Sequence, residues 1–371
     1  KNMAGIYVHV PFCKSKCTYC DFASYPNEYG KAELYFACLY KEMKARANQY
    51  KNHRFDTLYI GGGTPSFVDE KYITGVVKQA KEKFNLFPDA EITVEINPGT
   101  LTEAKLDAYR KAGINRFSVG LQSADDRMLS RLNRIHTLKD YLDCAAMLKG
   151  ENFNADALIG LFDQTSDDLK KTLDVIAESG ATHVSMYALK AEDGTPMYTN
   201  YLNGELPDDD AVAELYAYGV DYLDTLGYKR YEVSNFSKPG FRSRHNENYW
   251  KRGEYIGLGV AASSHMENRR FNNIPYIDDY VKCIISGYFA EENSEVIEGD
   301  EIKNEFIMLA LRTDDGIDRK EYKRLFGTDF TAEFPEELNK YAAVMDVSPR
   351  RVKIRPEYIF VQNSIIVDFL K

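Results

Sequence analysis

Three of the six cysteines lie close together near the start of the chain, in the stretch HVPFCKSKCTYCDF. Cys13, Cys17 and Cys20 are spaced C-x3-C-x2-C, directly after a strand-like segment. Four kinds of protein group cysteines in this way: disulfide frameworks, zinc proteins, dithiol redox proteins and iron–sulfur proteins. The spacing therefore predicts thiol or metal chemistry on a loop.

Composition and spacing help to separate these four alternatives. Six cysteines are few for a disulfide framework in a chain of 371 residues. Structural zinc needs a fourth ligand, and only His9 is near in sequence. A redox pair of Cys17 and Cys20 would lack the usual thioredoxin-like context. Three thiolates suit a four-iron cluster with one iron left open for a ligand. We expect such a cluster, in a reducing compartment, and therefore a cytoplasmic protein.

The elements that must position the cysteines read as alternating strands and helices. Segments of helical period, such as 102–113 and 166–180, end at Gly113 and Gly180, and Ser166 is the predicted N-cap of the second. Alternation of this kind is typical of a parallel sheet. The predicted strands cover residues 5–10, 57–62, 92–97, 116–122, 154–161 and 183–189.

Polar residues gather where these strands end. The segment GGGTPS, with Gly63 and Thr64, follows the second strand, and Glu95 lies at the end of the third. Gln122 ends the fourth strand, and Asp156 lies within the fifth. Because a parallel sheet places its chemistry at the carboxyl ends of the strands, we expect these residues at one edge, together with the cysteine loop.

The pattern changes beyond about residue 200. Long amphipathic segments, such as 207–228 and 318–327, alternate there with loop-rich sequence. We expect one unit over residues 1–200 and a second, smaller and mostly helical one over 201–371. With 57 acidic and 47 basic residues, the net charge of −10 disfavours nucleic acid as a partner. No apolar run reaches the roughly 18 residues of a membrane helix, so we expect membrane contact only through partners.

The cysteine spacing, Tyr19 just before the last cysteine and the GGGTP stretch resemble the radical S-adenosylmethionine (SAM) family. The resemblance covers about residues 5–200 and implies an α/β fold, a partial (β/α)6 barrel. It also implies a [4Fe–4S] cluster on Cys13, Cys17 and Cys20 that binds SAM at its open iron and cleaves it with one electron from a donor.

The other strand-end residues fit SAM as a ligand. We expect the backbone N–H groups of Gly63 and Thr64 to receive its amino or carboxylate group. Carboxylate and amide acceptors suit its amino group and ribose hydroxyls, and a guanidinium suits its carboxylate. The predicted SAM-binding residues are Tyr7, Tyr19, Gly63, Thr64, Glu95, Gln122, Arg134 and Asp156.

Further segments extend the resemblance over nearly the whole chain. EINPGT, RFSVGLQSADDRMLSRLNRIH, HNENYW and YIGLG resemble the group related to oxygen-independent coproporphyrinogen III dehydrogenase. Phe22 stands where that enzyme has a fourth cysteine, and the segment before the first strand is shorter. Both departures favour the haem chaperones of this group, which bind haem and transfer it to acceptor haemoproteins.

The stretch HNENYW matches a motif attributed to haem binding in those chaperones. The resemblance implies that His245 offers an imidazole to the iron, that Tyr249 and Trp250 offer flat apolar surface, and that Asn246 has a structural role. The alternative for His245 is a packed, hydrogen-bonded core histidine.

Three functions follow from the resemblance. The preferred one is a haem-binding and haem-delivering protein whose partners are haem, acceptor haemoproteins and an electron donor. The others are radical decarboxylation of coproporphyrinogen III and a radical SAM methyltransferase. We expect no dehydrogenase activity, because of Phe22, whereas cleavage of SAM stays open.

Overall fold

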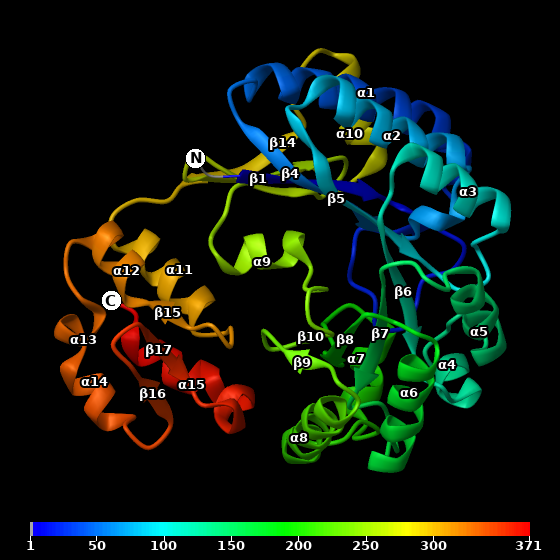
Figure 1. Ribbon diagram of the computed structural model, residues 1–371. Coiled ribbons are helices and arrows are strands. Elements are labelled where there is room, and N and C mark those ends of the chain that lie inside the picture. The colour runs from blue at the N-terminus through cyan, green and yellow to red at the C-terminus, as the bar shows by residue number, and fades with distance from the viewer. Residues whose placement is uncertain (1–2) are drawn as a thin grey trace.

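A computed structural model describes residues 3–371, and its main feature is one open sheet of twelve strands. The six central strands are parallel and stand side by side in the order of the chain (Figure 1). All six strands expected from the sequence, and with them the α/β fold class, are confirmed. They are β1 (Met3–Val10), β4 (Arg54–Gly62), β5 (Leu86–Ile96), β6 (Arg116–Gln122), β7 (Phe153–Ile159) and β8 (His183–Ala188).

Helices cover the convex face of this curved sheet (Figure 1). Their apolar residues pack on the strands. β6 is buried at every position: Phe117, Val119 and Leu121 lie in the core under the helices, and the residues of its other face line a cavity. These helices are α1 (Ala32–Gln49), α2 (Glu70–Lys83), α3 (Glu103–Ala112), α4 (Asp126–Arg131), α5 (Leu138–Met147) and α6 (Ser166–Glu178). The short pair β2 (Phe12–Cys13) and β3 (Tyr25–Pro26) encloses the cysteine loop.

The sheet continues beyond residue 200 at both of its ends. The strands β9 (Lys229–Arg230) and β10 (Asn235–Ser237) extend it beside β8. On the side of β1 it is extended by β11 (Tyr255–Leu258), β12 (Ser263–Met266), β13 (Arg269–Asn273) and β14 (Glu291–Val296). Helices in this region are α7 (Pro196–Leu202), α8 (Asp209–Thr225), α9 (Arg244–Trp250) and α10 (Ile277–Ile285). The sheet thus crosses the expected boundary at residue 200, and α9 lies on its concave side (Figure 1).

The last part of the chain forms a mostly helical lobe, as expected. Its three short strands, β15 (Ile317–Asp318), β17 (Arg351–Ile354) and β16 (Met345–Val347), pair in that order. Its helices are α11 (Asp300–Ala310), α12 (Arg319–Phe326), α13 (Phe330–Glu333), α14 (Pro335–Lys340) and α15 (Gln362–Ile366). Aromatic rings fill its core, where Phe330 and Phe369 stack with centroids 5.6 Å apart.

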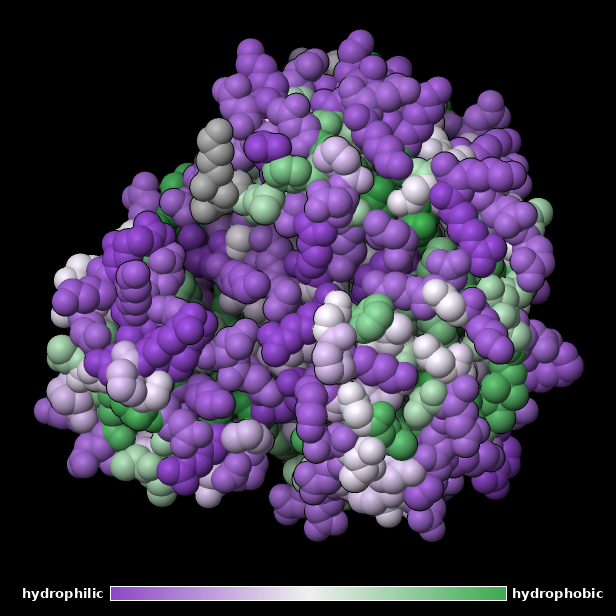
Figure 2. All heavy atoms as spheres, viewed as in Figure 1, coloured by the Kyte–Doolittle hydropathy of each residue, from purple (hydrophilic) through white to green (hydrophobic). Residues whose placement is uncertain are grey.

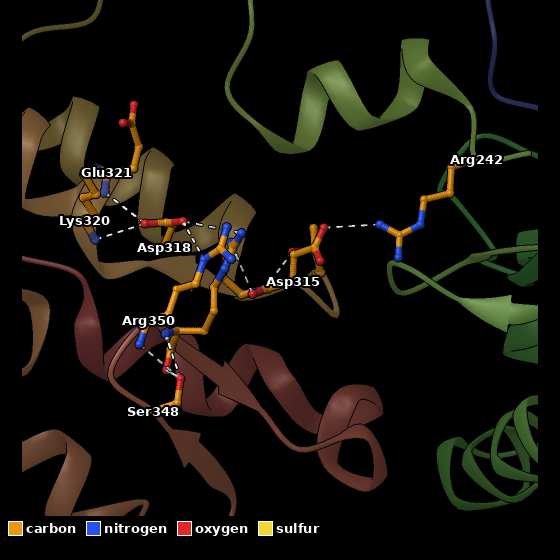
Figure 3. Close-up of polar contacts among 10 residues, drawn as sticks. Arg242, Asp315, Asp318, Lys320, Glu321, Ser348 and Arg350 are labelled. Carbon is orange, nitrogen blue, oxygen red and sulfur yellow. Dashed lines mark hydrogen bonds and ion pairs between the residues drawn. The ribbon is translucent and has the colours of Figure 1, made fainter. Parts of the chain in front are cut away.

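Ion pairs connect this lobe to the rest of the molecule. Arg242, in the loop before α9, reaches Asp315 at 3.2 Å (Figure 3), and Arg230 of β9 lies 2.5 Å from Asp314. Within the lobe, Asp318 caps α12 by accepting hydrogen bonds from two backbone N–H groups (Figure 3). The segment 313–318 therefore joins α12 to the sheet.

Side chains on the face in Figure 2 are predominantly hydrophilic, in line with 28% charged residues in the chain. Within residues 3–371 no helix combines the length and the apolar character needed to cross a membrane.

One predicted helix start is wrong. The sequence favours Ser166 as the N-cap of α6, but Thr165 holds that position. The Thr165 hydroxyl accepts a hydrogen bond from the Asp168 N–H (3.2 Å), and the Asp168 carboxylate accepts one from the Thr165 N–H (2.9 Å). This reciprocal pair is a capping box, which satisfies two N–H groups at once and so decides the register. The expected ends near Gly113 and Gly180 are confirmed, since both have a positive φ.

The capping box gives a stability prediction. Thr165→Ala should lower the free energy of unfolding by about 1 kcal/mol, because it removes the side-chain acceptor of the first turn. Ser166→Ala is the matched control and should leave it nearly unchanged. Denaturant unfolding of both variants checks this. Equal effects of the two substitutions would contradict the assignment of the cap.

Candidate functional site

The cysteine loop and the carboxyl ends of the parallel strands enclose a cavity of about 460 Å³. The prediction that strand-end residues from separate strands meet at one edge is confirmed, since most of the predicted residues line this cavity. They are Cys13, Cys17, Tyr19, Cys20, Gly63, Thr64, Glu95, Gln122, Arg134 and Asp156. Tyr7 does not line it: its hydroxyl donates to His9 Nδ1 (3.0 Å), and its ring borders a neighbouring cavity.

The glycine turn differs from the expectation. The N–H groups of Gly63 and Thr64 were expected to receive a ligand, but they donate to the carbonyls of Val10 and Phe12, both at 2.8 Å. They therefore fix the start of the cysteine loop to the end of β4. A Cβ on Gly63 would lie 2.8 Å from the Phe12 carbonyl oxygen, so this close approach requires glycine.

Two partly buried carboxyl groups, those of Glu95 and Asp156, face the cavity. Glu95 accepts hydrogen bonds from the Tyr59 hydroxyl (2.9 Å) and the Gly62 N–H (3.0 Å). Asp156 accepts one from the Asn154 amide at 2.7 Å. Burial raises the pKa of Glu95 to about 7 and that of Asp156 to about 6. At neutral pH Asp156 is therefore mostly ionised and Glu95 partly so, and a cation such as an amino group in the cavity would favour the ionised form of both.

Arg134 supplies the positive charge beside the cysteine loop. Its Nη2 donates to the Asn97 side chain (2.8 Å) and the Gly120 carbonyl (2.9 Å), and its Nη1 lies 3.5 Å from Cys17 Sγ. Its Nε has no partner within residues 3–371. Sequence reasoning missed Asn97 as the residue that orients this guanidinium, although its place two residues after Glu95 was a usable signal.

Gln122 reaches the cavity through a strained backbone. Its φ is +73°, in the region that favours glycine, and the pairing of β6 with β7 shifts between Gly120 and Gln122. Such a conformation costs a non-glycine residue about 1–2 kcal/mol. A Cβ on Gly120 would lie 3.0 Å from both the Gln122 amide nitrogen and Arg134 Nη2. The bulge is thus what turns Gln122 inward.

The three thiols fit an iron–sulfur cluster by their chemistry. They are soft sulfur ligands on one loop that face one cavity. The Ser24 hydroxyl lies 3.6 Å from Cys20 Sγ, and Arg134 is next to Cys17. Both polar groups can stabilise the thiolate form of these cysteines. In the part of the chain from 3 to 371 no three His, Cys, Asp or Glu side chains converge at metal-binding distance, so cluster binding would draw the thiols together.

His245 is buried in a hydrogen-bonded position. One ring nitrogen, Nδ1, lies 2.7 Å from Thr57 Oγ1, and the other, Nε2, lies 2.7 Å from the Tyr249 hydroxyl. The ring also stacks on Tyr59 with centroids 5.2 Å apart. Burial lowers the pKa of His245 to about 3, so the ring is neutral. Iron ligation by His245 would require one of these hydrogen bonds to break.

The rest of the HNENYW stretch faces three different spaces. Asn246 lines the cysteine cavity, Tyr249 lines the cavity that Tyr7 borders, and Trp250 lines a groove facing the C-terminal lobe. The structure therefore does not bring the four predicted haem residues together around one ligand. These residues belong to α9, and Glu91 anchors the start of that helix. Its carboxylate accepts hydrogen bonds from the N–H groups of Arg244 and His245. Sequence reasoning missed this role of Glu91.

Comparison with known proteins gives consistent matches. The radical SAM superfamily matches residues 7–176, and the HemN C-terminal domain matches residues 297–344. The chain is 30% identical to heme chaperone HemW of Bacillus subtilis, over 92% of this chain and 91% of the relative. It is 32% identical to heme chaperone HemW of Mycobacterium tuberculosis, over 84% and 82% respectively.

A solved structure shows the same fold. The chain superposes on coproporphyrinogen III oxidase (HemN) from Escherichia coli, described as a radical SAM enzyme, with a TM-score of 0.87. The alignment covers 100% of this chain and 91% of that one, at 21% sequence identity. The partial radical SAM barrel and the helical C-terminal part expected from the sequence are thereby confirmed.

The partly buried carboxyl groups predict a pH dependence of stability. Because folding raises the pKa of Glu95 from 4.5 to about 7, its contribution is fully present below pH 4.5 and is lost as the pH rises through about 7. In the protein without cluster or SAM, Glu95→Gln should remove much of this loss, since glutamine has no proton to release. Thermal unfolding from pH 5 to pH 8 measures it.

Glu178→Gln is the matched control for this measurement. Glu178 is exposed on α6 and makes no ion pair within the described chain, so its pH profile should follow that of the wild type. Parallel profiles for Glu95→Gln and the wild type would contradict the protonated, partly buried state of Glu95.

Proposed function

Since the chain belongs to the HemW family of the radical SAM superfamily, we propose that it binds haem and transfers it to acceptor haemoproteins. The observation that carries this proposal is the similarity, over most of both chains, to several proteins named heme chaperone HemW. The region matched to the radical SAM superfamily includes the cysteine loop and the ends of β4, β5, β6 and β7 that line the cavity. Support therefore comes from the whole architecture and not from one motif.

Membership of the radical SAM superfamily implies a [4Fe–4S] cluster and SAM. We propose that Cys13, Cys17 and Cys20 hold the cluster, whose chemistry when bound is the delivery of one electron to SAM. Glu95 and Asp156 would then accept hydrogen bonds from the amino group and the ribose hydroxyls of SAM. Arg134 would orient its carboxylate, being already fixed by Asn97 and the Gly120 carbonyl.

The remaining residues around the cavity have positioning roles in this proposal. Gly63 and Thr64 hold the start of the cysteine loop through their N–H groups, and Tyr19 packs within the loop. Gln122 presents its amide from the β6 bulge. We further propose a reducing, cytoplasmic location, because all six cysteines are unpaired thiols, and an electron donor as a second partner.

The cluster assignment predicts a selective loss of iron. After anaerobic reconstitution the wild type should hold about four iron atoms per chain. Cys17→Ala should lower this several-fold, because two thiolates hold a cluster poorly. Cys283→Ala is the matched control, since Cys283 lies on α10 away from the cavity, and it should keep the wild-type content. Equal iron in both variants would contradict the assignment.

The haem proposal is tested with the same reconstituted protein. Anaerobic titration with haem should give a saturable Soret band at one haem per chain, and the loaded protein should then convert an apo-haemoprotein to its holo form. Non-saturating binding would refute the chaperone proposal. Formation of vinyl groups from coproporphyrinogen III would favour the dehydrogenase, although this chain has Phe22 where that enzyme has a fourth cysteine. A methylated product would favour a methyltransferase.

A further inference from the structure

A second cavity, of about 580 Å³, adjoins the cysteine cavity. Asp21 and Phe22 of the cysteine loop line both spaces. The other walls come from β1, the end of α9 and the strands β11, β12 and β13. The side chains used below are Tyr7, Tyr249, Tyr255, Arg252, Arg270 and His265. Its volume lies within the range of small-molecule and cofactor pockets.

His265 of β12 differs from His245 in its hydrogen bonding. Its side chain is buried, with 2% of the residue exposed. Its Nδ1 lies 3.3 Å from the Gly253 carbonyl oxygen, which can only accept, so Nδ1 carries the hydrogen. Its Nε2 has no partner within residues 3–371. With the hydrogen on Nδ1, the Nε2 of a neutral ring offers a lone pair.

This arrangement is the one that metal-binding histidines commonly have. A backbone carbonyl that holds one ring N–H fixes the tautomer and the ring orientation, and the other nitrogen is left for the metal. Both nitrogens of His245, by contrast, are already bonded. Of the two buried histidines near α9, His265 is therefore the one whose ring can ligate a metal without losing a hydrogen bond.

Aromatic rings form an apolar part of the cavity wall. Tyr249 and Tyr255 lie edge to face, with centroids 4.6 Å apart. The ring of His265 lies 6.1 Å from that of Tyr255. Tyr7 and Phe22 complete this surface. A large apolar ligand that reaches the imidazole would contact the faces and edges of these rings.

Two arginines and the carboxylate of Asp21 line the cavity, and both arginines pair with Glu305 behind them. Arg252 Nε lies 2.7 Å from Glu305, and Arg270 Nη2 lies 3.0 Å from the same carboxylate. Arg252 Nη2 and Arg270 Nε have no hydrogen-bond partner within residues 3–371. Unpaired guanidinium N–H groups are donors for a further carboxylate, so a ligand here should be anionic at one edge.

We propose that this second cavity is the haem site, with Nε2 of His265 on the iron and Arg252 and Arg270 on the propionate carboxylates. The inference rests on the proposed function and deepens it by moving the axial ligand from His245 to His265. Because Nε2 is buried, haem entry includes the rotation of a covering side chain. Phe22, in place of a fourth cysteine, then supplies an apolar surface between the haem and the cysteine loop.

The test is an anaerobic haem titration of the full-length, cluster-loaded protein and of His265→Ala. The substitution should weaken haem binding at least tenfold and shift the Soret band, and added imidazole should restore the band. His53→Ala is the matched control, since His53 lines neither cavity, and it should bind as the wild type does. Circular dichroism and thermal unfolding show whether each variant is folded.

Two outcomes separate this inference from the proposed function. Saturable haem binding by the wild type, with unchanged affinity and spectrum in folded His265→Ala, overturns the site and leaves the chaperone function standing. Absence of haem binding by the wild type overturns both.

A second measurement keeps the proposal testable if His265→Ala does not fold. The wild type should bind haem dimethyl ester, which lacks the propionate charges, about tenfold more weakly than haem. Arg252→Gln and Arg270→Gln should weaken haem binding but leave binding of the ester unchanged. Equal affinity of the wild type for haem and for the ester overturns the assignment of the two arginines.

Discussion

Two backbone hydrogen bonds hold the centre of this molecule together. The N–H groups of Gly63 and Thr64 donate to the carbonyls of Val10 and Phe12, so the loop after β1 is bound to the loop after β4. Neighbouring parallel strands end at the same edge of the sheet. These two bonds continue the alignment of β1 and β4 beyond the strands, as far as the start of the cysteine loop. The glycine is needed because any side chain at position 63 would strike the Phe12 carbonyl. This contact therefore helps to fix the position of the three thiols.

Charge in the cavity is arranged around the fixed loop. Glu95 and Asp156 come from strands on one side, and Arg134 comes from the segment between α4 and α5. Low solvent access raises the pKa of both carboxyl groups, whereas the guanidinium stays charged beside Cys17. A ligand with both an amino and a carboxylate group satisfies both signs at once, and its amino group would favour the ionised form of a neighbouring carboxyl group. The same cavity would be costly to fill with a neutral molecule.

The buried histidines His245 and His265 show how one residue type can serve different purposes in one region of the fold. His245 links α9 to β4 through Thr57 and to Tyr249, which makes it part of the packing of the helix. His265 is held at one nitrogen only, beside arginines that have unsatisfied N–H groups. A buried nitrogen without a hydrogen-bond partner lowers the stability of the fold. A ligand that binds to Nε2 of His265 in the second cavity would account for this unsatisfied nitrogen.

The sequence by itself determined the six parallel strands, the edge at which the polar residues meet and the cysteine chemistry, because hydrophobic period and residue spacing are local properties. It did not determine the hydrogen-bond partners of Gly63 or His245. Those depend on atoms brought close by folding: the Phe12 carbonyl and the Thr57 hydroxyl, the latter almost two hundred residues away. Only the tertiary structure could decide which histidine is left with a free nitrogen, because satisfying a buried polar group is a property of its surroundings and not of its motif.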